Sequence, residues 1–130
     1  ADIVLAGAML KWDEPAEGAQ DVAEYWIYRS KLPIPDDIEQ ARREGQLIVL
    51  EARVDAAVRQ CAVRMDDLLR TYCIDVAGEE LPSYYRIVAV NYAGERSLPS
   101  GEVMLNPRWM KIPAGEPLNV RKEPILREVP

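Results

Sequence analysis

The sequence predicts an all-β fold with one short helix. Two nine-residue segments, 22–30 and 83–91, alternate their side chains between two faces with a period of two, which is typical of β-strands. A third segment, 3–12, is strongly apolar, and turn-forming residues separate the three segments. A chain of 130 residues is long enough to bury a sizeable core, so we expect one domain.

The segment 83–91 is predicted to be a central strand. Tyr85 and Ile87 share one face, and two valines make the opposite face partly apolar, so both faces can be buried. Residues 91–94 favour a turn because Asn and Gly tolerate positive φ. A last short strand, 101–106, is expected after Pro99, which cannot donate a backbone hydrogen bond inside a sheet.

Three segments resemble one known family. Residues 84–95 read Tyr-Tyr-Arg-Ile-Val-Ala-Val-Asn-Tyr-Ala-Gly-Glu, which resembles the F strand and F–G loop of a fibronectin type III domain. Residues 8–12 end in Trp12 before Asp-Glu-Pro and resemble the B strand of that family, whose Trp fills the core. Residues 25–30, Tyr-Trp-Ile-Tyr-Arg-Ser, resemble its C strand, and the three segments follow in the family's order.

The resemblance implies a fibronectin-III- or immunoglobulin-like antiparallel β-sandwich. The sandwich would occupy residues 1–106, with an insertion at about 32–70, and residues 107–130 would form a proline-rich extended tail or arm. The residues expected in the core between the two sheets are Trp12, Tyr25, Ile27, Tyr85 and Ile87.

The chain departs from the family pattern in three places. The connection between the C and F strands is longer than usual. Ser83 stands where most members carry a corner tyrosine, a role that Tyr84 would have to take over. Because only eleven residues precede Trp12, strand A is expected to be very short or absent, which would leave a sheet edge open.

The insertion is predicted to begin with a short helix. Two prolines at 33 and 35 end the second strand, and a helix over 37–44 follows. Asp36 can cap its first turn, and Gly45 can end it because glycine adopts positive φ. Residues 46–54 then predict a strand, with the apolar run Leu-Ile-Val-Leu at its centre.

Residues 54–76 allow two interpretations. Apolar residues fall at helical spacings from Val54 to Leu68, but they also alternate as in a strand over 61–65. A hairpin that turns at 66–67 is favoured, because residues 73–75, Cys-Ile-Asp, resemble the start of the family's E strand. The hairpin would place Cys61 opposite Cys73, within reach of a disulfide. Two buried free thiols are the alternative.

The tail differs from the body in charge and in proline content. It holds five of the ten prolines, which suit neither a helix nor a central strand. Its five basic and three acidic side chains give a net charge of +2, whereas 11 basic and 19 acidic side chains give residues 1–106 a net charge of −8. The tail also keeps apolar residues, so we expect residues 108–126 to dock as an extended arm on the same sandwich or on a neighbouring copy.

Candidate binding residues lie in the predicted F–G loop and in the tail. Glu95 and Arg96 are near a loop tip, where binding residues often occur, although a solvated turn also explains them. Trp26 could form a platform for a sugar, or it could pack beneath the insertion. The apolar tail residues that could contact a partner are Trp109, Met110, Ile112, Leu118 and Val120.

Composition argues against several classes of function. The net charge of −6 disfavours nucleic-acid binding, and the lack of His removes the commonest general base and metal ligand. Acidic pairs at 36–37, 66–67 and 79–80 lie at predicted turns or at a helix start, where acids are favoured without any catalytic role. No phosphate-binding loop, catalytic serine motif or zinc motif is present, so we expect no enzyme activity, cofactor or metal. No apolar run reaches the roughly 18 residues of a membrane helix.

The expected function is that of a non-enzymatic structural or interaction subunit in an extracellular or cell-surface assembly. Its expected partners are proteins, including copies of itself, which would bind through sheet edges, loops and the arm. Two alternatives remain open: a subunit of a phage tail or other virion particle, and a carbohydrate-binding accessory module of a secreted glycan-active system. Secretion with removal of a signal peptide is expected, although Ala1 could equally follow a removed Met.

Overall fold

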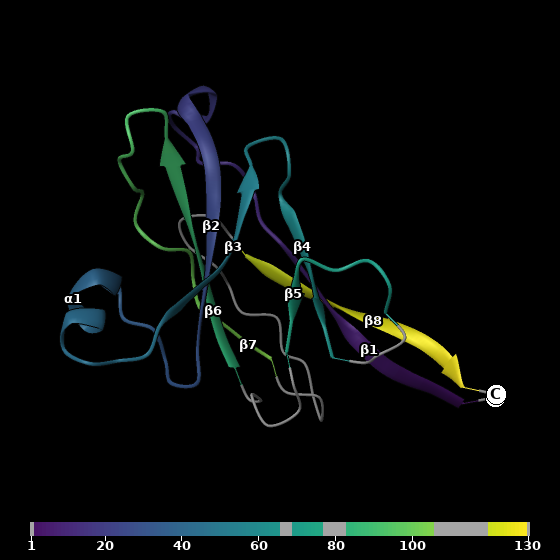
Figure 1. The fold of residues 1–130 in the computed structure, drawn as a ribbon. Coiled ribbons are helices and arrows are strands. Elements are labelled where there is room, and N and C mark those ends of the chain that lie inside the picture. The colour runs from purple at the N-terminus through teal and green to yellow at the C-terminus, as the bar shows by residue number, and fades with distance from the viewer. Residues whose placement is uncertain (1, 66–68, 77–82, 106–119, 130) are drawn as a thin grey trace.

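The computed structural model of the chain describes residues 2–65, 69–76, 83–105 and 120–129. Within these ranges, two four-stranded sheets pack face to face as a β-sandwich, and one short α-helix lies beside them (Figure 1). The predicted all-β sandwich with a short helix is therefore confirmed. No helix in the described ranges is long and apolar enough to cross a membrane.

The first sheet has the strand order β5 (Ile74–Asp75), β4 (Gln60–Arg64), β1 (Asp2–Lys11) and β8 (Arg121–Val129). The apolar opening stretch thus forms one ten-residue strand, and Trp12 follows directly after it. β8 runs antiparallel along the whole of β1, with one irregularity in the register next to Leu5 (Figure 1). The C-terminal strand therefore lies along the edge of this sheet.

The second sheet has the strand order β3 (Val49–Asp55), β2 (Val22–Ser30), β6 (Ser83–Asn91) and β7 (Val103–Leu105). All its neighbouring strands are antiparallel. β6 has a strand on each side, as predicted for a central strand, and β3 lies at an edge. A register shift between Ile27 and Tyr28 marks a β-bulge where β2 pairs with β3.

The inner faces of the two sheets form the main core, which we call the inner core. Trp12 is 2% exposed and packs edge-on against Tyr25, with 5.6 Å between the ring centroids. Ile27, Tyr85 and Ile87 are completely buried in the same cluster. Alternation along each strand brings every second side chain to this layer, which explains why the strand pattern indicated these residues.

The helix α1 (Ile38–Arg43) is shorter than predicted, and its cap lies one residue later. Asp37, not Asp36, accepts a hydrogen bond from the backbone N–H of Gln40, at 3.0 Å. Gly45 has φ of 102°, so it ends the helix as expected. A short 3-10 helix, Ala19–Asp21, precedes β2.

The predicted hairpin at 61–73 is wrong, because β4 and β5 are parallel. Parallel strands cannot be joined by a tight turn, so a hairpin turning at 66–67 is not compatible with this pairing. Residues 60–64 nevertheless form a strand, which excludes the helical interpretation there. Cys61 and Cys73 form the predicted disulfide, with Cα atoms 5.6 Å apart. A disulfide indicates an oxidising compartment.

Candidate functional site

Residues 31–48, the part of the predicted insertion that lies between β2 and β3, cover the outer face of the second sheet, and the name insertion is used for this segment from here on. Its apolar side chains pack there on strand residues and form a second apolar cluster, which we call the outer cluster. α1 supplies two buried residues to it, and the segments before and after α1 supply one each. The buried members of the outer cluster are Tyr28, Ile34, Ile38, Ala41, Ile48, Val88 and Val90.

Arg86 of β6 fastens the insertion to the sheet. Its guanidinium donates hydrogen bonds to the carbonyl of Ile34 at 2.7 Å and to that of Ser100 at 2.8 Å. It also forms an ion pair with Asp36 at 2.8 Å, and its own side chain is only 11% exposed. Glu102 adds a bond by accepting from the Ile34 N–H at 2.6 Å. These charge-assisted bonds fix the position of the insertion.

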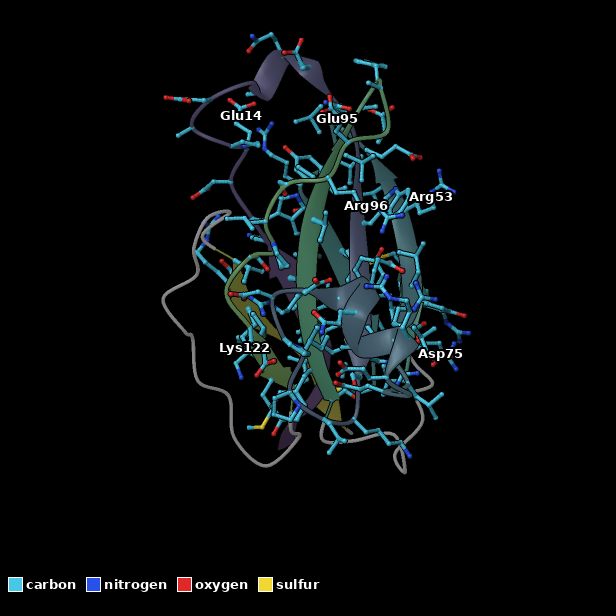
Figure 2. All side chains as sticks on the ribbon, turned by 90° about the vertical axis from the view of Figure 1, so that its left-hand side faces the viewer. Glu14, Arg53, Asp75, Glu95, Arg96 and Lys122 are labelled. Atoms are coloured by element: carbon cyan, nitrogen blue, oxygen red, sulfur yellow. A yellow bond between two sulfur atoms is a disulfide. The ribbon has the colours of Figure 1, made fainter. Side chains whose placement is uncertain are left out.

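Two arginines lie over the ring of Trp26, an arrangement that we call the Arg–Trp cluster. Arg53 comes from β3 and Arg96 from the loop after β6, with guanidinium carbons 4.8 Å and 4.6 Å from the ring centroid. Figure 2 shows Arg53 and Arg96 on the same side of the sandwich. Such cation–π contacts are favourable. Carboxylates complete the cluster: Glu24 accepts from Arg53 at 2.7 Å, and Glu39 of α1 accepts from Arg96 at 2.8 Å.

The electrostatics of the Arg–Trp cluster favour the ionised form of Glu24. Hydrogen bonds from Arg53 and from the Trp26 indole N–H lower the pKa of the Glu24 carboxyl. Glu24 therefore keeps its charge until the pH falls through this lowered value. Trp26 was also a candidate platform for a sugar. Because two guanidinium groups lie over its ring, a carbohydrate that stacks on Trp26 would have to displace an arginine.

Glu95 and Arg96 are neighbours in sequence but serve different contacts. Asn91 shapes the turn, because its side-chain oxygen accepts from the backbone N–H groups of Ala93 and Glu95. Its amide nitrogen then donates to the Glu95 carboxylate at 3.1 Å, so Glu95 belongs to the loop itself. Arg96 instead reaches α1 and Trp26. The two residues do not form one binding pair.

A groove opens at the end of the sandwich where β2 stops and β3 begins. It has a volume of about 580 Å³. Three of its side chains are exposed aliphatic groups: Leu32 at 63%, Leu47 at 85% and Val49 at 46%. Gln46 holds its wall in place by donating to the Pro33 carbonyl at 2.9 Å and to Ser30 at 3.2 Å. An ordered apolar groove of this size is the kind of feature that accepts a ligand side chain.

The C-terminal strand contributes a buried cation. Lys122 is 1% exposed, is paired in register with Leu10, and donates through its amino group to the Met104 carbonyl on β7. Burial lowers the pKa of the Lys122 amino group. In Figure 2, Lys122 lies on the side of the molecule away from Arg53.

Val120, a predicted binding residue of the tail, is 1% exposed in the inner core. Four other predicted tail contacts lie outside the described residues: Trp109, Met110, Ile112 and Leu118.

The acidic pairs contribute no cluster of possible metal ligands in the described ranges. Asp36 pairs with Arg86 and Asp37 caps α1, so both have a structural partner. The pairs at 66–67 and 79–80 lie outside the described residues.

Two features were missed by sequence reasoning. The run at 47–50 was interpreted as the centre of a strand, whereas Leu47 precedes β3 and is solvent-exposed. Successive side chains of a strand point to opposite faces, so a run of four apolar residues at a sheet edge must expose some of them. This run could have indicated an exposed apolar surface. No signal indicated Lys122, because a lysine in a charged, proline-containing segment normally faces solvent.

Comparison with protein-family models, with curated proteins and with solved structures finds no match for this chain. The fold and the two surfaces, the groove and the Arg–Trp cluster, are therefore the basis on which function is inferred.

Proposed function

We propose that this chain is a fibronectin-III-like, non-enzymatic interaction module of an extracellular or surface assembly. The two packed sheets and the sequence resemblance support the class of domain. The disulfide between Cys61 and Cys73 supports an oxidising location. The module binds a partner protein through the groove at the start of β3.

The observation that carries this proposal is the exposure of Leu32, Leu47 and Val49 around one groove. Exposed aliphatic side chains that gather in a hollow mark interaction sites more often than scattered ones do. The volume of about 580 Å³ is within the range of small-ligand sites and can take a large apolar side chain.

The partner that fits is an extended protein segment with an apolar anchor residue. β3 lies at the edge of its sheet, so its outer backbone groups have no strand partner among the described residues. An extended segment can add to such an edge while its side chain enters a neighbouring pocket. The bulge and the charged residues Glu51 and Arg53 protect the rest of this edge from unspecific pairing. A partner segment can therefore pair only with the apolar first end of β3, beside the groove.

Site-specific photo-crosslinking tests the proposal. A photoreactive phenylalanine analogue at position 47 is expected to trap one defined protein from the native assembly, and Val49→Asp should reduce that product at least tenfold. The matched control is the same analogue at Tyr92, which is 81% exposed but outside the groove. Equal labelling from both positions would show that the groove has no specific partner.

The same sandwich would suit a subunit of a phage tail or other particle, in which case the trapped protein is a structural component of that particle. A carbohydrate-binding function has less support, because the Trp26 ring lies beneath two guanidinium groups. Binding to a panel of immobilised glycans that is lost in Trp26→Ala would favour it instead.

A further inference from the structure

β8 pairs with β1 in the first sheet and also contacts the second sheet through Lys122, which donates to the Met104 carbonyl. It pairs with β1 from Lys11 opposite Arg121 to Asp2 opposite Val129. Two ion pairs reinforce this contact, Lys11 with Glu123 at 3.0 Å and Asp13 with Arg121 at 3.1 Å. The edge of β1 therefore accepts one extended strand along its whole length.

The connection to β8 is much longer than its position requires. Lys122 donates a hydrogen bond to Met104, so the start of β8 lies within one side-chain length of β7. Yet residues 106–120 separate the two strands in sequence. Fully extended, such a length spans about 50 Å, while a folded domain of this size has a radius of gyration of about 14 Å. The chain is long enough for β8 to reach β1 of a second copy in contact with the first.

Exchange of β8 between copies would preserve its described interactions. Every contact with β1 would be replaced by the identical contact in the other copy. The opposite net charges of residues 107–130 and 1–106, +2 and −8, attract within one chain or between two. Lys122 is 1% exposed, and its hydrogen bond to the Met104 carbonyl would be remade in the other copy after exchange.

We propose that β8 is an exchangeable strand through which two copies of this chain associate, each placing its β8 against β1 of the other. The partner of the β1 edge is thus the β8 strand of a second copy of the same chain. This surface is on the first sheet, so the inference does not depend on the partner proposed for the groove beside β3.

Cysteine pairing in the full chain tests the exchange. Met9 and Glu123 are register partners, so cysteines at these positions can bond across the strands. One chain carries Met9→Cys, and another with a mass tag carries Glu123→Cys; both are mixed at high concentration below the melting temperature and then oxidised. A disulfide-linked heterodimer is expected at least tenfold above a control that pairs Met9→Cys with Tyr92→Cys, an exposed site distant in sequence from β8. Heterodimer at the control level would overturn the proposal.

A locked variant separates strand exchange from other modes of association. In the double variant with Met9→Cys and Glu123→Cys in one chain, oxidation ties β8 to its own β1. We expect the oxidised variant to remain monomeric by sedimentation at concentrations where the reduced variant dimerises. If the locked form dimerises equally, or if neither form dimerises, β8 exchange is wrong. Circular dichroism of each single variant checks that it is folded before mixing.

Discussion

The inner core and the outer cluster are both apolar, but they are assembled differently. The inner core lies between two sheets, and alternation along the strands supplies its residues. The outer cluster lies between one sheet and the insertion, and Arg86 and Glu102 position the segment that closes it. One layer follows from strand geometry, whereas the other depends on a few polar contacts that join segments distant in sequence.

This difference locates the candidate interaction surfaces. The groove and the Arg–Trp cluster both border the outer cluster or the insertion, and none of their exposed residues belongs to the inner core. The inner core thus provides a rigid scaffold, and the insertion provides surfaces that can vary without changing the sandwich.

Trp12→Ala should produce the largest effect, because it removes the largest side chain of the inner core. Loss of a buried Trp costs about 3–5 kcal/mol, which is enough to unfold a marginally stable domain. Urea unfolding followed by circular dichroism measures the change, with Tyr92→Ala as an exposed control that should change stability by less than about 0.5 kcal/mol. A cost below about 1 kcal/mol for Trp12→Ala would contradict the placement of this side chain in the inner core.

Removing the disulfide between β4 and the residue before β5 should have the second-largest effect on stability. The bond joins residues 12 apart, and closing so short a loop contributes about 2–3 kcal/mol. The double variant Cys61→Ala and Cys73→Ala should therefore melt at a lower temperature than the wild type. Reductant should lower the melting temperature of the wild type and leave that of the variant unchanged. Mass spectrometry that finds two free thiols in protein isolated without reductant would contradict the bond.

Lys122→Met should stabilise the fold by about 1 kcal/mol, because burying an ammonium group costs more free energy than its hydrogen bond to the Met104 carbonyl returns. The pKa of Lys122 is lowered in the folded state, so below that value folding must bury the charged form. As the pH rises through the lowered pKa toward the ordinary lysine value, the unfolded chain binds more protons, and the wild type gains stability. The advantage of the variant should therefore shrink with rising pH in urea titrations. An advantage that stays constant up to pH 10.5 would argue against a buried ammonium group.

The Arg–Trp cluster should give the smallest effect. Each cation–π contact at an exposed site contributes about 0.5–1 kcal/mol, so Arg53→Met and Arg96→Met should each cost about that much. A double-mutant cycle of each arginine with Trp26→Leu isolates the contact, and Arg59→Met is the control for loss of a surface arginine. Coupling energies near zero for both pairs would mean that the arginines add nothing to the stability of this face.

The sequence could predict the strands that build the inner core but not the long-range contacts that hold the outer cluster. β2 and β6 were predicted with their observed bounds, because residues such as Tyr25 and Ile87 alternate over a full strand. The disulfide was predicted, but the parallel direction of β5 was not, since a two-residue strand has no readable pattern. The pairing of Arg86 with Asp36 could not be predicted either, because a contact between residues 50 apart leaves no local signal.

Arg86 holds the insertion against the second sheet as a separate layer, and hydrogen–deuterium exchange of the wild type and of Arg86→Gln tests this role. Glutamine cannot reproduce the ion pair with Asp36 together with both carbonyl contacts. We expect faster exchange in α1 and residues 45–48 of the variant, while the amides of β1 and β4 keep their wild-type rates. A uniform increase through both sheets, or no increase in α1, would contradict the anchoring role of Arg86.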